Sequence, residues 1–152
     1  MNRFLLIAAL ALYGGLAIAQ QLPKQLPNEA DLKAAYCSSV VRSWIQVFNQ
    51  DFSGYDADVK KEMAKLIAET EEDLRRLESY LFPRMRYLDL LSITAAVERG
   101  KADVARNQQD GQTCREFCPD KKTRTSCLEK CRDDGAAYKR IAVCGDLSFL
   151  PF

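Results

Sequence analysis

Apolar and polar positions alternate with helical spacing along most of the chain after residue 28. Between about Glu29 and Asn49 the apolar residues recur three and four positions apart, which predicts a first helix with one broad apolar face. Asn28 precedes this segment and suits a helix N-cap, because its side chain can accept a hydrogen bond from the first turn. The apolar positions are Leu32, Ala35, Tyr36, Val40, Trp44, Val47 and Phe48.

The longest regular pattern follows a break at Asp51 to Tyr55. Asp56 or Asp58 can cap the next helix, whose apolar positions form a stripe over more than three heptads. Such a stripe could pair with another chain, but a chain with several amphipathic helices more often buries it internally. We therefore expect internal burial. The stripe consists of Val59, Met63, Leu66, Ile67, Thr70, Leu74, Leu77 and Leu81.

Proline and glycine predict where the later helices begin and end. Pro83 should end the second helix and start a third, because proline removes a backbone donor and clashes with the preceding turn. Gly100 predicts an end or a kink, and residues 101–112 are polar enough to be a continuation of the helix or a link. Within them, Asn107 to Gly111 predicts a loop.

Four of the six cysteines form a nearly palindromic pattern: C-x3-C, eight residues, then C-x3-C. Cysteines four positions apart lie on one face of a helix, so two such pairs predict a small antiparallel helical hairpin. Pro119 should end its first arm, because the residue before a proline disfavours helical geometry. The second arm begins near Thr123 or Thr125 and can extend past Gly135 to Val143.

Hairpin geometry narrows the pairing of the cysteines. The outer two, Cys114 and Cys131, face each other across the two arms, as do the inner two, Cys118 and Cys127. Cys37 and Cys144 remain, and their bridge would tie the first helix to the end of the chain. Four cysteines could instead bind zinc, but their spacing and an oxidising compartment favour disulfides. No metal site is predicted.

The amino terminus predicts the compartment. Arg3 supplies a short positive region, residues 4–16 form an apolar run, and Ala17-Ile18-Ala19 fits a cleavage site. We expect a signal peptide over residues 1–19 and a secreted, extracellular domain over residues 20–152, with 20–27 as a flexible leader. The alternative is a membrane anchor, but the apolar run is short for one.

The amino-acid composition excludes several kinds of catalytic and metal-binding site. The chain has no histidine, which excludes Ser-His-Asp and Cys-His catalysis and histidine zinc sites. The acidic clusters at residues 71–73 and 133–134 lie in surface patterns and lack calcium-loop spacing. We therefore predict no catalytic residues, no cofactor and no enzymatic activity. Loss of Arg3 would lower the formal charge from +1 to 0, so no nucleic-acid or membrane partner is expected.

Two segments are candidates for contact with a partner. Lys121, Lys122 and Arg124 form a basic cluster at the hairpin tip, which an acidic partner could contact, although an ordinary solvated loop is favoured. Phe149 and Phe152 belong to an apolar carboxyl-terminal tail. Packing of this tail back onto the bundle is favoured over exposure, because large exposed apolar patches are uncommon on monomers.

The sequence resembles the anophensin/albicin family of anopheline mosquito salivary proteins. Tyr36-Cys37 and Trp44 on the first helix, the Leu-rich second helix and the cysteine hairpin carry the resemblance. The helical patterns and the cysteine hairpin by themselves predict an all-α, disulfide-stabilised helical bundle. The resemblance implies that this bundle binds a host plasma protein, either a complement convertase component or a contact-phase factor. The implied activity is inhibition of the alternative complement pathway or of contact and kinin activation, by a monomer without catalysis.

A carrier of a small hydrophobic ligand is the second hypothesis. Insect odorant-binding proteins are also secreted, all-helical and of similar size, with six cysteines. Here, however, no cysteine lies between Cys37 and Cys114, so the pairing of that family cannot be transferred to these positions. A carrier would need a closed apolar pocket, for which Met63, Leu66, Leu88 and Leu91 are the expected lining.

Overall fold

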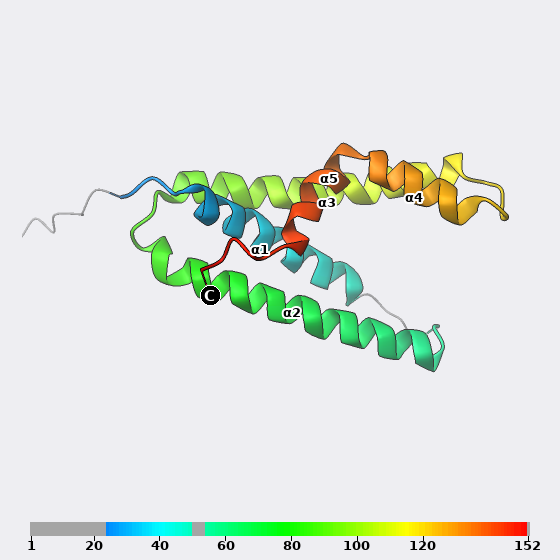
Figure 1. Cartoon of the computed structure of the whole chain (residues 1–152), viewed down its shortest axis with the longest axis horizontal. Helices are drawn as coiled ribbons and strands as arrows, with labels where there is room; N and C mark the ends of the chain where they lie inside the picture. The colour runs from blue at the N-terminus through cyan, green and yellow to red at the C-terminus, as the bar shows by residue number, and fades with distance from the viewer. Residues whose placement is uncertain (1–23, 50–53, 152) are drawn as a thin grey trace, which may run out of the picture.

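The computed structural model describes residues 24–49 and 54–151, and it confirms the all-α class. Over these residues the chain forms five α-helices and one short 3-10 helix (Figure 1). The predicted signal peptide at 1–19 and the candidate contact Phe152 lie outside the described residues. The elements are α1 (Glu29–Phe48), α2 (Ala57–Met85), α3 (Leu90–Phe117), α4 (Arg124–Asp134), α5 (Ala136–Ala142) and η1 (Val143–Gly145).

The start of α1 is held by a capping box. The side chain of Asn28 accepts a hydrogen bond from the Asp31 N–H at 2.8 Å, and the Asp31 carboxylate accepts one from the Asn28 N–H at 3.1 Å. Two backbone donors without helical partners are thereby satisfied. The predicted caps at Asn28 and Asp56 are both confirmed, the latter through a 2.9 Å bond from the Val59 N–H.

The predicted helix break at Pro83 is wrong. Pro83 lies in the last turn of α2, which continues to Met85, so the proline removes a single bond close to an end where the helix is already stopping. The third helix begins at Leu90 instead. Its N-cap is Asp89, whose carboxylate accepts from the Ser92 N–H at 3.0 Å and the Ser92 hydroxyl at 2.8 Å.

The predicted helix end at Gly100 and the predicted loop at Asn107 to Gly111 are also wrong, because α3 is one helix of 28 residues. The alternative that residues 101–112 continue the helix is confirmed. Gly100 is buried where α3 crosses α1, and its missing side chain allows the two helices to approach closely. Farther along, the Arg106–Asp110 ion pair at 2.9 Å supports the helix through the polar stretch.

The described part of the predicted flexible leader is attached to the α2–α3 turn. The Gln25 N–H donates to the Tyr87 carbonyl at 2.7 Å, and the Asp89 N–H donates to the Gln25 carbonyl at 2.9 Å. These bonds form an isolated parallel bridge between Gln25 and Leu88. Gln25 is thereby placed beside the α2–α3 turn, whereas the flexibility of the leader stays a prediction.

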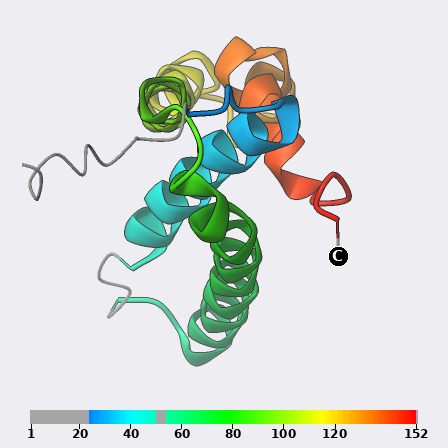
Figure 2. The ribbon, with the colours of Figure 1, turned by 90° about the vertical axis from the view of Figure 1, so that its left-hand side faces the viewer.

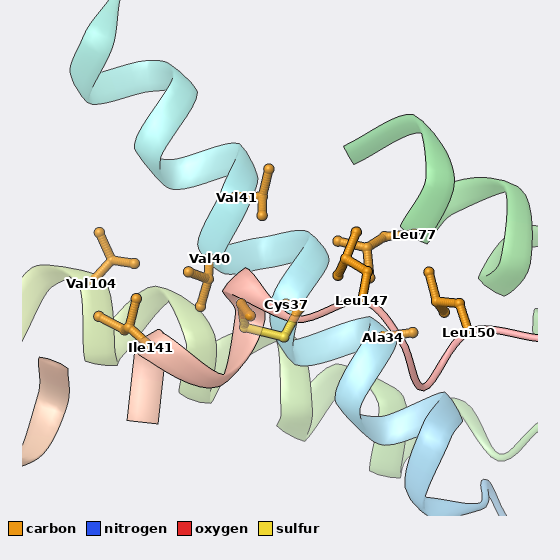
Figure 3. Close-up of a cluster of buried hydrophobic side chains, with 10 residues drawn as sticks. Ala34, Cys37, Val40, Val41, Leu77, Val104, Ile141, Leu147 and Leu150 are labelled. Atoms are coloured by element: carbon orange, nitrogen blue, oxygen red, sulfur yellow. A yellow bond between two sulfur atoms is a disulfide. The ribbon is translucent and has the colours of Figure 1, made fainter. Parts of the chain in front are cut away.

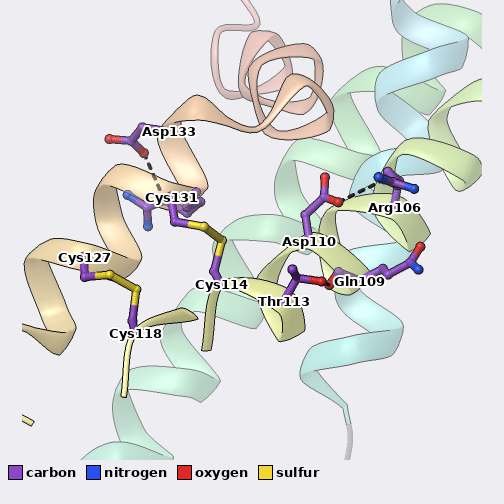
Figure 4. The surroundings of a disulfide bond; sticks show 10 residues. Arg106, Gln109, Asp110, Thr113, Cys114, Cys118, Cys127, Cys131 and Asp133 are labelled. Atoms are coloured by element: carbon purple, nitrogen blue, oxygen red, sulfur yellow. Dashed lines mark hydrogen bonds and ion pairs between the residues drawn. A yellow bond between two sulfur atoms is a disulfide. The ribbon is translucent and has the colours of Figure 1, made fainter. Parts of the chain in front are cut away.

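The hairpin joins the carboxyl-terminal half of α3 to α4 through two disulfides, Cys114–Cys131 and Cys118–Cys127 (Figure 4). These pairs are the ones predicted from the cysteine spacing. The second arm does not extend as a continuous helix to Val143, because Gly135 has an extended backbone and α5 starts after it. Thr123 takes the N-cap position of α4 without a side-chain bond to the helix.

α1 lies between α2 and α3 and contributes to both apolar clusters of the core (Figure 2). The larger cluster surrounds the Cys37–Cys144 disulfide, which attaches α1 to η1 as predicted (Figure 3). Leu147 and Leu150 are buried in it, which confirms that the described part of the tail packs back on the bundle. The smaller cluster consists of Ala35, Leu81, Leu88, Ile93 and Ala96.

The apolar stripe of α2 is buried only in its second half. Leu77 and Leu81 lie in the core, whereas Val59 and Leu66 are exposed. The expectation that the whole stripe is buried internally is therefore wrong. α1 leaves the first turns of α2 uncovered, because the two helices diverge toward the end of α1 and the start of α2 (Figure 2).

Candidate partner-binding surfaces

A groove of about 560 Å³ lies over α1, between α2 and α3. It exists because both helices pack against α1 and diverge from each other beyond the α2–α3 turn (Figure 1). Its α2 wall is apolar, with Leu81, Phe82 and Met85, and its α3 wall carries Ile93 and Val97. The Arg42–Glu78 ion pair and Lys101 border the groove.

The floor of the groove is formed by serines of α1 whose hydroxyls bind their own helix. Ser38 donates to the Ala35 carbonyl at 3.0 Å, Ser39 to the Tyr36 carbonyl at 2.8 Å and Ser43 to the Ser39 carbonyl at 2.8 Å. Each hydroxyl hydrogen is therefore already used. The small side chains leave space above α1 and offer few free donors, so the groove suits an apolar occupant.

The groove continues into an exposed apolar corner at the α2–α3 turn. Leu90 lies one helical turn before Ile93 on the same face of α3, so it extends the groove wall outward. Around the turn, Phe82, Tyr87 and Leu91 are also exposed, and the Arg86 guanidinium carbon lies 5.3 Å from the centre of the Tyr87 ring. We define this surface, with Phe82, Arg86, Tyr87, Leu90 and Leu91, as the α2–α3 corner.

A buried carboxylate holds the corner against α1. Asp31 accepts hydrogen bonds from Arg84 Nε at 2.6 Å, Arg84 Nη2 at 3.2 Å and the Tyr80 hydroxyl at 3.0 Å. Burial opposes ionisation of Asp31, but the hydrogen bonds from Arg84, Asn28 and Tyr80 outweigh it and lower the carboxyl pKa. The end of α2 is thereby fixed beside the start of α1.

A second network lies on the other side of α1. Asp103 accepts from the Tyr36 hydroxyl at 2.9 Å and from Arg140 Nε and Nη2 at 2.9 and 2.5 Å. The Arg140 bonds lower the pKa of Asp103, while burial and the bond to Asp103 raise the pKa of Tyr36. A carboxylate that stays ionised and a phenol that stays protonated act as fixed hydrogen-bond partners at neutral pH, rather than as proton-transfer groups.

The contact residues predicted from the sequence lie at two separate places. Lys121 and Lys122 are exposed at the hairpin tip, but Arg124 donates to the Cys118 and Pro119 carbonyls, both at 3.2 Å, and so supports the turn. Phe149 is half-buried against the core with Lys33 Nζ 4.3 Å from its ring centre. Figures 1 and 2 show the tip far from the tail.

Sequence reasoning missed the groove and the α2–α3 corner. The available signal was the density of aromatic and basic residues around Pro83, a segment that also fits a helix boundary.

Among the described residues, no group of three or more carboxylate, cysteine or histidine side chains could hold a metal ion. None of the described helices combines the length and apolarity needed to cross a membrane.

Compared with protein-family models, with curated proteins and with solved structures, the chain matches none of them.

Proposed function

We propose that this protein is a secreted, non-catalytic inhibitor that binds a host plasma protein and restrains the alternative complement pathway or contact and kinin activation. The resemblance to salivary proteins supports the biological setting. The observation that carries the binding role is the continuous apolar surface formed by the groove and the α2–α3 corner.

This surface has the composition of a protein-binding centre. Phe82 and Tyr87 are large and exposed, and Arg86 lies over Tyr87, so aromatic and arginine anchors are already next to each other. The Asp31 network and the Gln25 bridge hold the turn before a partner arrives. A preorganised surface loses less conformational entropy on binding, which favours affinity.

The carrier hypothesis has weaker support. Of its four expected lining residues, Leu88 is buried in the smaller core cluster, whereas Leu91 is 82% exposed and Leu66 is also exposed. These side chains do not surround one pocket. The groove itself is bordered by ionic side chains, which suits a polar-rimmed protein contact better than a small apolar molecule.

The test is capture of plasma proteins with the recombinant chain, followed by a complement haemolysis assay and a contact-activation assay. We expect a specific plasma protein to bind and one of the two assays to be inhibited. Absence of a bound protein together with no inhibition in either assay would refute the proposal. Release of a bound apolar molecule on denaturation would instead support the carrier.

Surface variants locate the binding site. Leu90→Asp should weaken capture at least about tenfold, because it places a charge in an apolar contact. Leu66→Asp is the matched control, since Leu66 is a leucine of α2 that does not line the groove and is 40% exposed, against 41% for Leu90. Both variants should keep the helical circular dichroism of the wild type. Equal capture by the two would exclude the α2–α3 corner as the binding site.

A further inference from the structure

Five tyrosines lie in the described part of the chain, and they differ in exposure and in the charges around them. Tyr36 and Tyr80 are partly buried and donate to Asp103 and Asp31. Tyr138 is half-buried, has the Arg132 guanidinium carbon 4.9 Å from its ring centre, and is followed by two basic residues. Tyr55 and Tyr87 are the two exposed tyrosines of this group, at 54% and 52%.

The two exposed tyrosines have opposite surroundings in the sequence. Tyr55 is followed by Asp56 and Asp58, and the nearest basic residue on that side is Lys60. Tyr87 is preceded by Arg84 and Arg86. An enzyme whose cleft is basic therefore attracts the segment around Tyr55 and repels the segment around Tyr87, although the two residues are exposed to a similar extent.

The backbone at Tyr55 also favours access by an enzyme. Residues 54–56 lie before the first turn of α2 and have no regular secondary structure. The side chain of Tyr55 is 54% exposed at this position. Tyr36, Tyr80 and Tyr138, by contrast, lie within helices.

We propose that Tyr55 is a tyrosine sulfation site. This inference rests on the secretory route that is part of the proposed function, because tyrosine sulfation takes place in the lumen of that route. The phenolic oxygen of Tyr55 attacks the sulfur of an activated nucleotide sulfate. The new bond joins sulfur to the tyrosine oxygen, the bond from sulfur to the phosphate oxygen breaks, and the phenol proton passes to a base of the sulfotransferase.

The product has physical consequences at this position. A sulfate ester keeps a negative charge at physiological pH and offers strong acceptor oxygens, as phosphate esters do. Beside Asp56, the N-cap of α2, this charge is compatible with the helix dipole. Sulfated Tyr55 would form an anionic contact for a basic surface on the partner, in addition to the apolar α2–α3 corner.

The experiment expresses the full chain in secreting animal cells and measures the peptides of the protein recovered from the medium. We expect the Tyr55 peptide to gain the mass of one sulfuryl group and the Tyr87 peptide to stay unmodified. The gain should disappear in Tyr55→Phe and after chlorate treatment, which blocks synthesis of the sulfate donor. Asp58→Asn should lower the modified fraction several-fold.

An unmodified Tyr55 peptide in the secreted protein overturns the proposal. So does an adduct that a phosphatase removes, since phosphorylation adds nearly the same mass. A second arm separates failure of the site from failure of secretion: purified wild-type chain is incubated with a tyrosylprotein sulfotransferase and the nucleotide sulfate donor. Transfer to Tyr55 but not Tyr87 supports the site even if the chain is retained in cells, and absence of transfer refutes it.

Discussion

Gly100 determines how closely α1 and α3 approach each other. A Cβ atom at this position would lie 2.0 Å from the Ser39 hydroxyl oxygen and 2.6 Å from the Tyr36 carbonyl oxygen. The serine side chain could rotate away, but the carbonyl belongs to the backbone of α1. The helices would therefore have to separate, so this glycine is required by packing and not by an unusual backbone conformation.

We expect Gly100→Ala to destabilise the protein by about 1–3 kcal/mol, the usual range for overpacking a core. Gly111→Ala is the control in the same helix. A Cβ atom at Gly111 would have no atom within 4 Å, so alanine should stabilise α3 by about 0.5–1 kcal/mol. Urea unfolding followed by circular dichroism measures the free energy of unfolding of both variants. A stable Gly100→Ala variant would show that the crossing of α1 and α3 is loose enough to admit a methyl group.

The charge of Asp31 contributes a pH-dependent stability. Its pKa in the folded protein lies below the ordinary value of about 3.9, so the unfolded chain takes up the proton first as the pH falls. The stability that ionised Asp31 contributes is therefore complete above about pH 5. It is lost as the pH falls through the pKa that Asp31 has in the folded protein.

Asp31→Asn should lower stability at neutral pH by about 1.5 kcal/mol, near the low end for hydrogen bonds to charged groups because Arg84 is partly exposed. The difference between wild type and variant should shrink at low pH, where Asp31 is protonated and resembles the amide. Unfolding in urea at pH 7 and at about pH 2 measures this. If wild type and Asp31→Asn differed in stability by the same amount at both pH values, the charge of Asp31 would contribute nothing to stability.

At the scale of elements, α2 and α3 are longer than their local signals predict. Pro83 lies at the end of α2, where one missing bond matters little, and Gly100 and Gly111 lie inside α3. Glycine in a helix costs about 1 kcal/mol, which burial of Ile93, Ala96 and Val104 on the same helix outweighs. Local propensity therefore located the helix starts at Asn28 and Asp56 and the end of the first helix near Asn49, but it missed the end of α2 at Met85, the start of α3 at Leu90 and the continuity of α3.

The disulfides differ in how much chain they close. Cys37–Cys144 spans 107 residues, whereas Cys118–Cys127 spans 9. The chain-entropy model assigns about 4.7 kcal/mol to a loop of about 100 residues and less than about 3 kcal/mol to the short one. We expect Cys37→Ala/Cys144→Ala to be clearly less stable than Cys118→Ala/Cys127→Ala, as measured by thermal unfolding. Equal losses would show that the hairpin carries as much stability as the long bridge.

At the scale of the whole molecule, the core and the proposed binding surface meet along α2. Leu81 and Phe82 are adjacent, but Leu81 is 4% exposed and Phe82 is 57% exposed. Leu81→Ala should cost about 2–5 kcal/mol, because it leaves a cavity in the smaller cluster. Phe82→Ala should change stability by less than about 1 kcal/mol while weakening capture of the proposed plasma partner. The opposite pattern would mean that Phe82 belongs to the core.

Local information in the sequence was sufficient for the all-α class, the caps at Asn28 and Asp56, and the two hairpin disulfides, because spacing along one or two helices decides each of them. The third pair, Cys37–Cys144, followed because these two cysteines remained once the hairpin pairs were assigned. The length of α3, the partial burial of the α2 stripe, the groove and the α2–α3 corner depend on residues that are distant in the sequence. The groove exists because α2 and α3 pack on the same helix and diverge from each other. No periodicity within either helix encodes that divergence, so only the tertiary structure decided where an apolar surface stays exposed.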